Sequence, residues 1–467
     1  MNKKTCIAMV PCPGLSHLIP LVEFAKLLVH NHIQFHVTFL VPTFGPLSSS
    51  MQDILYSLPP NIDFILLPQV KNLPPNLEPA SQMKLIVKNS VPFLIEEVES
   101  LISKTHLVSL VFGVFSTDVH EVAKQFNLSS YIFYASGAVS LSFLHTLPNL
   151  DEKLSSEVKS LESAYETLNI PGSVIPYHIK DIPDPLLCER SSDVYKLFLE
   201  VCTEFSLVDG VIINTFTDLE PEVIRVLQEK KKPFVYPVGP IIRKESNNNK
   251  DNILMCLKWL ENQPPSSVIY VCFGSGGTLS HEQFNELAFG LELSGCKFLW
   301  VVRVPSNDVS SAYFVGKKED PLEYLPNGFL ERTKDKGLVV PSWAPQVEIL
   351  GHESIGGFLS HCGWSSTLES VVNGVPMIAW PLFAEQRMNA RELVDVLKVG
   401  VRAKVDDENG IVKRDEVVKA IKRIKEGDES LEIKNRIKEL SVSAANALRE
   451  HGSSKKALSD LALRWHI

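Results

Sequence analysis

The stretch SIGGFLSHCGWSSTLESVVNG, residues 354–374, has the pattern of a strand, a turn and a helix in immediate succession. The apolar run 354–360 is typical of a buried strand, and 365–374 has the pattern of a short helix that ends at Gly374. The turn HCGW (361–364) therefore lies between the carboxyl end of a strand and the amino end of a helix. Units of this kind build α/β folds with parallel sheets.

Backbone N–H groups and the helix dipole at this turn favour a bound phosphate. Ser365 and Ser366 add hydroxyls, His361 can donate from the side, and Glu369 can accept from a ribose diol. Close packing of small residues explains the same stretch, so both interpretations stay open. A metal centre is not expected, because zinc needs three or four ligands and no second pair lies near His361 and Cys362. A thiol nucleophile lacks a local base.

The same alternation continues through both halves of the chain and predicts parallel sheets covered by helices. Helices are expected at 17–31 and 118–126, and strands at 5–11, 35–42, 109–115, 267–275, 296–303, 337–343, 354–361 and 375–381. The proline- and asparagine-rich stretch 236–252 has no periodic apolar pattern and predicts an interdomain linker, and 304–326 predicts a surface loop. We expect two Rossmann-like, doubly wound lobes facing a cleft, with ligands at the strands' carboxyl ends.

A chain of 467 residues is too long for one ordinary core. We place an N-terminal lobe at 1–240, a linker at 241–252 and a second lobe at 253–450. A C-terminal helix at 451–467 is expected to pack back on the first lobe.

Composition excludes several classes of protein. The chain is 45% hydrophobic and 22% charged, which is typical of a globular protein, and its net charge of −9 argues against a nucleic-acid or anionic-membrane partner. No segment has the length of apolar sequence that a membrane helix needs. Eight cysteines without a C-x-x-C pair suit free thiols in the cytosol. The N-terminus resembles a signal peptide, but Pro11 and Pro13 interrupt its apolar run, so we expect a first strand there.

Two further turns are candidates for chemistry. CFGSGGTLS (272–280) has G-x-G without the third glycine of a dinucleotide site, and it suits either a phosphate cradle or an ordinary tight turn. PCPGLSHLIP (11–20) puts His17 at a helix start, where the dipole favours the neutral imidazole that a general base needs. A lone histidine is more often structural than catalytic, so this position alone does not decide between the two roles. Asp118 follows a later strand, in a position to accept a hydrogen bond from His17 and orient it.

From Trp343 to Gln386 the sequence WAPQVEILGHESIGGFLSHCGWSSTLESVVNGVPMIAWPLFAEQ closely resembles the donor-binding box of plant secondary-product UDP-glycosyltransferases. The resemblance extends along the chain through P-G-x-x-H, V-G-P and F-G-S. Within the family, the chain most resembles the branch that acts on small phenols such as hydroquinone and phenylpropanoids. The stretch DPLEYLPNGFLERT (320–333) is part of that resemblance.

The resemblance implies a GT-B fold, with UDP-sugar in the C-terminal lobe and the acceptor in the N-terminal lobe. Trp343 would stack on uracil, Gln346 would bond to the nucleoside, and Glu369 would hold the ribose. The full set of donor-binding positions that it implies is Ser275, Trp343, Ala344, Gln346, His361, Gly363, Trp364, Ser365, Ser366, Glu369, Trp380, Glu385 and Gln386.

In that set the diphosphate would be contacted by His361, Ser366, the backbone near Gly363, and Ser275. One position departs from the family, which usually has asparagine where this chain has Ser365. The shorter serine reaches less far, and the lost hydrogen bond to a charged group would cost about 1.5–3 kcal/mol. A water would replace part of it.

Trp380, Glu385 and Gln386 would address the sugar hydroxyls, and the terminal glutamine is the family's residue for glucose. His17 matches the catalytic base and Asp118 its partner. We therefore expect UDP-glucose as co-substrate and inverting transfer that yields β-glucosides. Because the chain contains no D-x-D triplet, we expect no metal and no other cofactor.

The acceptor is the least determined part of the prediction, and transfer to oxygen, nitrogen or sulfur stays open. Aromatic candidates for its pocket are equally explicable as core, and they are Phe115, Phe133, Tyr134, Phe143 and Phe383. We expect a monomer. Two rival functions are a nucleotide-cofactor oxidoreductase, disfavoured by the incomplete glycine motif, and a non-catalytic sugar-nucleotide-binding protein, disfavoured by the presence of both His17 and Asp118.

Overall fold

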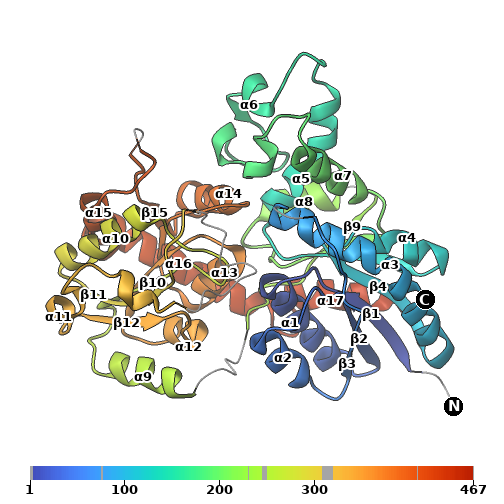
Figure 1. Cartoon of the computed structure of the whole chain (residues 1–467), viewed down its shortest axis with the longest axis horizontal. Coiled ribbons are helices and arrows are strands. Elements are labelled where there is room, and N and C mark those ends of the chain that lie inside the picture. Colours follow the sequence, from blue (N-terminus) through green and yellow to red (C-terminus); the bar gives the residue numbers. More distant parts are fainter. Residues whose placement is uncertain are drawn as a thin grey trace. The chain divides into compact units, whose positions relative to one another are not determined.

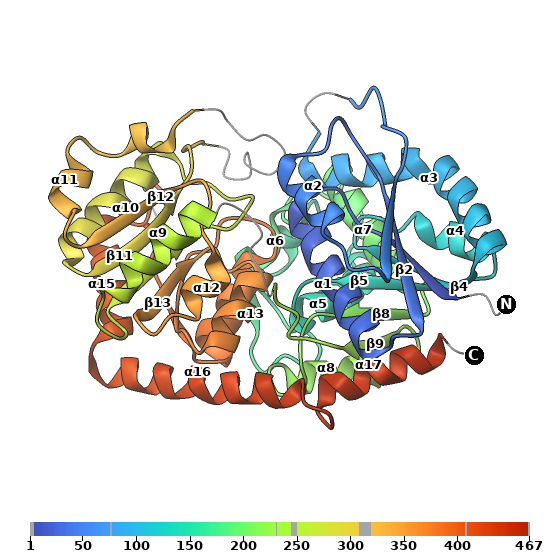
Figure 2. The same cartoon turned by 90° about the horizontal axis from the view of Figure 1, so that it is seen from below.

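The computed structural model describes residues 4–74, 77–229, 231–243, 250–307, 319–406 and 409–465 of the chain. The chain divides into two compact units (Figures 1 and 2). Unit 1 comprises Met1–Arg243 and Asn446–Ile467, and unit 2 comprises Lys244–Ala445. Each unit has its own parallel sheet with helices on both faces, which confirms the prediction of two doubly wound lobes.

The sheet of unit 1 has seven parallel strands in the order β3-β2-β1-β4-β5-β8-β9. These strands are β1 (Thr5–Val10), β2 (Phe35–Val41), β3 (Ile62–Leu66), β4 (His106–Gly113), β5 (Ser129–Tyr134), β8 (Gly210–Ile213) and β9 (Phe234–Pro237). The helices are α1 (Leu15–Asn31), α2 (Ser49–Tyr56), α3 (Pro79–Lys104), α4 (Val119–Gln125), α5 (Ala138–Glu152), α6 (Leu161–Ala164), α7 (Asp193–Glu204), α8 (Pro221–Gln228) and α17 (Ser453–Arg464). Two short 3₁₀ turns (Ile179–Asp181 and Asp184–Leu186) and an antiparallel pair, β6 (Thr167–Leu168) and β7 (Tyr177–His178), complete the unit.

One face of this sheet is covered by α1, α2 and α17. Helix α1 forms because its apolar residues recur at three- and four-residue intervals, so that one side of the helix is buried on the strands. Each fully buried leucine or phenylalanine contributes roughly 1.5–3 kcal/mol. The buried apolar residues of α1 are Leu18, Leu21, Val22, Phe24, Ala25, Leu28 and Val29. The opposite face packs against α3 and α4.

The order of connection reverses between β1 and β4, which are neighbours in the sheet. The chain after β1 turns to one side and the chain after β4 to the other. The loops 11–14 and 114–118 therefore begin at the same edge, where ligands bind in doubly wound sheets. His17 lies in the helix that follows the first loop, and Asp118 is the last residue of the second.

Unit 2 repeats the arrangement with six parallel strands in the order β12-β11-β10-β13-β14-β15, reversing between β10 and β13. They are β10 (Val268–Cys272), β11 (Lys297–Val302), β12 (Gly337–Pro341), β13 (Ile355–Ser360), β14 (Met377–Ala379) and β15 (Gly400–Arg402). The helices are α9 (Lys250–Glu261), α10 (His281–Ser294), α11 (Phe329–Thr333), α12 (Gln346–Leu350), α13 (Trp364–Asn373), α14 (Gln386–Arg391), α15 (Arg414–Lys425) and α16 (Gly427–Ala447), with a 3₁₀ turn (Pro321–Tyr324) and a π turn (Glu392–Val396).

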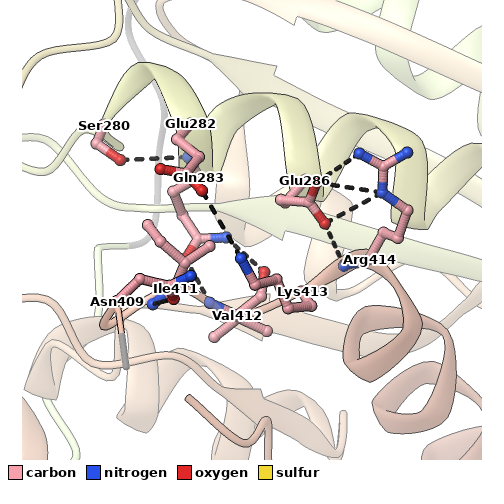
Figure 3. Close-up of polar contacts among 9 residues, drawn as sticks. All are labelled: Ser280, Glu282, Gln283, Glu286, Asn409, Ile411, Val412, Lys413 and Arg414. Carbon is pink, nitrogen blue, oxygen red and sulfur yellow. Dashed lines mark hydrogen bonds and ion pairs between the residues drawn. The ribbon is translucent and has the colours of Figure 1, made fainter. Parts of the chain in front are cut away.

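Helices α10 and α15 are held together by polar contacts (Figure 3). The Glu286 carboxylate accepts from the backbone N–H of Arg414 at 2.6 Å and from its guanidinium. The side chain of Gln283 bonds to both the N–H and the carbonyl of Val412. A Cβ at Gly290 would lie 2.5 Å from Val417, so glycine allows this close approach.

Most predicted strands are present but shorter than expected. The run 267–275 ends at Cys272 because Gly274 takes a φ of +74° and turns the chain out of the sheet. The helix predicted to end at Gly374 does so, and Gly374 caps it with a φ of +67°. Within the expected loop 304–326, residues 308–318 lie outside the described ones.

The boundaries of the two units lie a few residues from the predicted ones. Of the expected linker 236–252, Tyr236 and Pro237 belong to β9, α9 begins at Lys250, and residues 244–249 lie outside the described part of the chain. Asn446–Ile467 belongs to unit 1. There α17 lies beside β9, and Trp465 is buried against the rings of Phe35 and Tyr131.

Candidate functional site

The turn between β13 and α13 is fixed from inside the protein. Cys362 takes a φ of +63° and is fully buried, and its carbonyl accepts from Asn389 Nδ2 at 3.0 Å. Gly363 is the N-cap of α13 and supplies no side-chain cap. The amino end of the helix is thus aimed outward from the sheet edge with its dipole available to an anion.

His361 is enclosed by the two glycine turns at the switch point of unit 2. A Cβ at Gly274 would lie 2.5 Å from its Cε1 and Nε2, and one at Gly363 would lie 2.5 Å from its Nε2. Burial, and to a lesser degree the charge of Arg303, lowers the pKa of His361 to about 4. The imidazole is therefore neutral at pH 7, and when the Ser360 hydroxyl, 3.3 Å away, donates to Nδ1, Nε2 carries the proton and can donate it.

Three of the predicted donor residues form one hydrogen-bonded cluster. Gln346 Nε2 donates to Glu369 Oε2 at 2.6 Å and to Ser366 Oγ at 2.9 Å. Tyr270 OH donates to Gln346 Oε1 at 3.4 Å from the floor of the sheet. The first residue of α12 is in this way tied to the first two turns of α13. Sequence reasoning missed Tyr270, a polar ring in the fully buried strand β10.

The remaining donor candidates surround this cluster. Trp343 is partly exposed, just after β12, while Ala344 and Trp364 are buried. Ser365 is half-buried in the first turn of α13, and Ser275 is exposed on the glycine turn.

After β14, Trp380 lies with its ring edge-on to Phe273, 6.0 Å between centroids. Gln386 is 5% exposed, and its Oε1 accepts from the N–H groups of Leu382 and Phe383 at 2.9 and 3.1 Å. Glu385 directly precedes it as the N-cap of α14. The amide oxygen of Gln386 therefore holds the loop between β14 and α14 in its conformation.

In unit 1, His17 is in the first turn of α1, after the N-cap Gly14. Burial lowers the pKa of His17 to about 4, so it is neutral at pH 7. This is the direction expected from the sequence, and burial contributes to it. The Phe115 ring packs against the imidazole, edge-on at 6.0 Å.

The loop that carries Asp118 is held from two sides. Cys12 Sγ accepts from Phe115 N at 3.2 Å and from Ser116 Oγ at 3.4 Å, which joins the loops after β1 and β4. Lys84 on α3 forms an ion pair with Asp118, 3.0 Å between Nζ and Oδ2. The hydrogen bond from His17 to Asp118 stays a prediction. A lysine among the apolar positions of α3 was the signal that would have revealed this partner.

The acceptor candidates separate into two groups. Phe133 stacks on Phe24 in the hydrophobic core of unit 1, and Phe143 is 1% exposed. Tyr134 is buried, with its hydroxyl bonded to Ser140. Phe115 contacts His17, and Phe383, in unit 2, is half-buried.

The structure also addresses the metal and thiol alternatives. Burial raises the pKa of Cys362 to about 12, so this thiol is protonated and inert at neutral pH. Over the described ranges, no cluster of three or more histidine, cysteine, aspartate or glutamate side chains is arranged to hold a metal ion. Within the same ranges, no helix combines the length and the apolar character needed to cross a membrane.

Comparisons with known proteins identify the family of the chain. The family model "UDP-glucoronosyl and UDP-glucosyl transferase" matches residues 168–441. A hydroquinone glucosyltransferase of Rauvolfia serpentina is 49% identical over 465 residues, covering 98% of this chain and 97% of that protein.

Solved structures of plant glucosyltransferases are similar to the chain along its whole length. A UDP-glucosyltransferase of Polygonum tinctorium, capable of glucosylating indoxyl and solved with 3,4-dichloroaniline, has a TM-score of 0.91 and 44% identity over the full length of both chains. Phytolacca americana UGT2, solved with UDP-2fluoro-glucose and pterostilbene, has a TM-score of 0.90 and 43% identity, covering 99% of this chain and 100% of that chain. These matches support a UDP-glycosyltransferase over the rival oxidoreductase. The chain belongs to the UDP-glucoronosyl and UDP-glucosyl transferase family, and it is a family 1 UDP-glycosyltransferase of the plant type with the GT-B fold.

Proposed function

We propose that this UDP-glucosyltransferase moves glucose from UDP-glucose to the hydroxyl of small aromatic acceptors with inversion at the anomeric carbon. The observation that carries the proposal is that each unit holds one neutral histidine at the reversal point of its sheet. His361 lies between two glycine turns at the reversal point of one sheet, and His17 lies at the reversal point of the other.

For the donor, Trp343 stacks on the uracil while Gln346 contacts the nucleoside. Glu369 accepts from the ribose hydroxyls, and its bond from Gln346 fixes the carboxylate for that purpose. His361 and Ser366 donate to the diphosphate together with the amino end of α13. These groups stabilise the charge that grows on UDP as it leaves.

The backbone near Gly363 and the Ser275 hydroxyl complete the diphosphate contacts. Trp380, Glu385 and Gln386 address the sugar hydroxyls, and glutamine in the last position favours glucose. Ala344, Trp364 and Ser365 shape the surrounding wall.

In the reaction, neutral His17 takes the proton of the acceptor hydroxyl. The acceptor oxygen forms a bond to the anomeric carbon as the bond from that carbon to UDP breaks, so an α-linked donor gives a β-glucoside. Asp118 orients His17 and stabilises its cation. A positioned base of this kind contributes roughly 10²–10⁴-fold to the rate.

Small phenols are the proposed acceptors, because the relatives named above act on hydroquinone or indoxyl and one was solved with pterostilbene. Phe115 is the candidate acceptor residue that packs on the base. We propose that the enzyme needs no metal, and that it works as a monomer in the cytosol, where its eight free cysteines would stay reduced.

The test of the base is His17→Ala, with His30→Ala as matched control. His30 is an exposed histidine on the same helix, at its other end. His17→Ala should lower kcat roughly 10²–10⁴-fold while calorimetry still measures UDP-glucose binding. His30→Ala should behave as the wild type. Comparable turnover in His17→Ala would overturn the assignment.

A further inference from the structure

A buried lysine lies beside the proposed catalytic pair and has no assigned role. Lys84 is 4% exposed although its helix, α3, carries charged residues on its solvent side. Its Nζ donates to Thr117 Oγ1 at 2.5 Å and forms ion pairs with Asp118 and Glu204, each at 3.0 Å. Burying an ammonium is costly unless charged partners compensate.

The charges around Lys84 keep it ionised. Burial alone would lower the pKa of Lys84, but the carboxylates of Asp118 and Glu204 outweigh burial and hold this pKa above its ordinary value. Glu200 adds a third carboxylate at 3.8 Å. The ammonium is therefore a permanent part of the site at neutral pH.

Asp118 depends on this ammonium. Its Oδ2 is buried, and apart from the Lys84 ammonium no polar partner is found for it in the part of the chain that the structure describes, so the ion pair with Lys84 is what compensates its charge. Without Lys84, that oxygen would be a buried anion beside Glu204. The carboxylate would then turn toward water and leave its place in the loop.

The surroundings make Lys84 specific for this loop. Thr117 and Asp118 are adjacent in the segment after β4, and Lys84 contacts both. The other end of the segment is held by Cys12, which accepts from Phe115 and Ser116. The loop after β4 is thus bonded to the Cys12 thiol at one end and to the Lys84 ammonium at the other.

We propose that Lys84 is a positioning residue that holds the Asp118 carboxylate where it orients His17. The inference rests on the proposed function, in which His17 is the base and Asp118 its partner. Lys84 contacts neither substrate, and it acts only through Asp118.

The test is a double-mutant cycle of Lys84→Met and Asp118→Asn. Lys84→Met should lower kcat for a phenol roughly 10- to 100-fold, as expected for a displaced catalytic group. The Kd of UDP-glucose should change less than about twofold, within ordinary additivity error. The double variant should be no slower than Asp118→Asn alone, because Lys84 has nothing left to position.

Two further variants separate positioning from general stability. Lys84→Arg keeps the cation and should restore most of kcat. Lys88→Met makes the same change as Lys84→Met at an exposed position of the same helix, and it should leave kcat within about twofold of the wild type. If Lys84→Met does not fold, as judged by thermal melting, Lys84→Gln takes its place in the cycle.

The outcomes are distinct. If Asp118→Asn retains full kcat, the proposed role of Asp118 fails and this inference fails with it. If Asp118→Asn is slow but Lys84→Met is not, or if the losses multiply in the double variant, only the role of Lys84 is overturned. Non-additive losses together with rescue by Lys84→Arg establish it.

Discussion

Gly274→Ala tests whether His361 binds the donor. Gly274 has a φ of +74°, and a Cβ there would lie 2.5 Å from two atoms of the His361 ring. Adding the methyl group therefore costs roughly 1–2 kcal/mol of backbone strain, as for any L-residue in the left-handed region. The new methyl group also displaces the imidazole of His361, and with it the Nε2 atom that would donate to the diphosphate. The ring must move because Cβ contacts under 3.0 Å essentially do not occur.

The expected loss follows from the contact that is displaced. A hydrogen bond to a charged group contributes about 1.5–3 kcal/mol, which corresponds to a roughly 10- to 150-fold rise in the Kd of UDP. Isothermal titration calorimetry with UDP and with UDP-glucose measures it. Both ligands should weaken equally, because the displaced contact is to the diphosphate that they share.

Gly295→Ala is the matched control. Gly295 ends α10 with a φ of +65°, so alanine brings the same kind of strain, but its nearest neighbour is Lys336 Nζ at 3.6 Å. This variant should lose a similar amount of stability and bind UDP as the wild type does. The reasoning is refuted if folded Gly274→Ala binds UDP as tightly as the control.

Four more predictions follow from the same geometry. Because burial lowers the pKa of His17 to about 4, the base stays neutral as the pH falls through 6.5, and kcat/KM should drop only toward pH 4; a drop centred near 6.5 would contradict this. Glu369→Gln should weaken UDP binding roughly 10- to 150-fold but scarcely affect 2′-deoxy-UDP, and equal losses for the two would remove the ribose role. Ser365→Asn should leave the Kd of UDP-glucose unchanged or lower it, whereas a large rise would mean that the site is adapted to serine. EDTA should leave turnover intact, and loss of activity that Mg²⁺ restores would show a metal requirement.

Local signals in the sequence predicted the turn between β13 and α13 well. The apolar strand 354–360, the glycine at 363 and the final Gly374 each mark a boundary of the element next to them in the sequence. For that reason the ends of α13 are correct to about one residue. The strands that extended too far, such as 267–275, did so because apolar residues continue into the turn.

Contacts between distant parts of the chain were beyond prediction. Tyr270 reaches Gln346 from another strand, and Lys84 reaches Asp118 from another helix. Such pairs depend on how layers stack, which periodicity does not encode. Periodicity also does not distinguish an aromatic residue of the core from one of a pocket. Phe133 and Phe143 are buried in the core, and Phe115 packs on His17.

The central claim is inverting transfer of glucose to a small phenol. Its most direct measurement incubates the purified protein with UDP-α-glucose and a panel of phenols that includes hydroquinone. Mass spectrometry detects the product, and proton NMR gives its anomeric configuration. The predicted result is the addition of one hexose as a β-glucoside, with release of UDP. An α-glucoside, or release of UDP without a glucoside of any phenol in the panel, would contradict the claim.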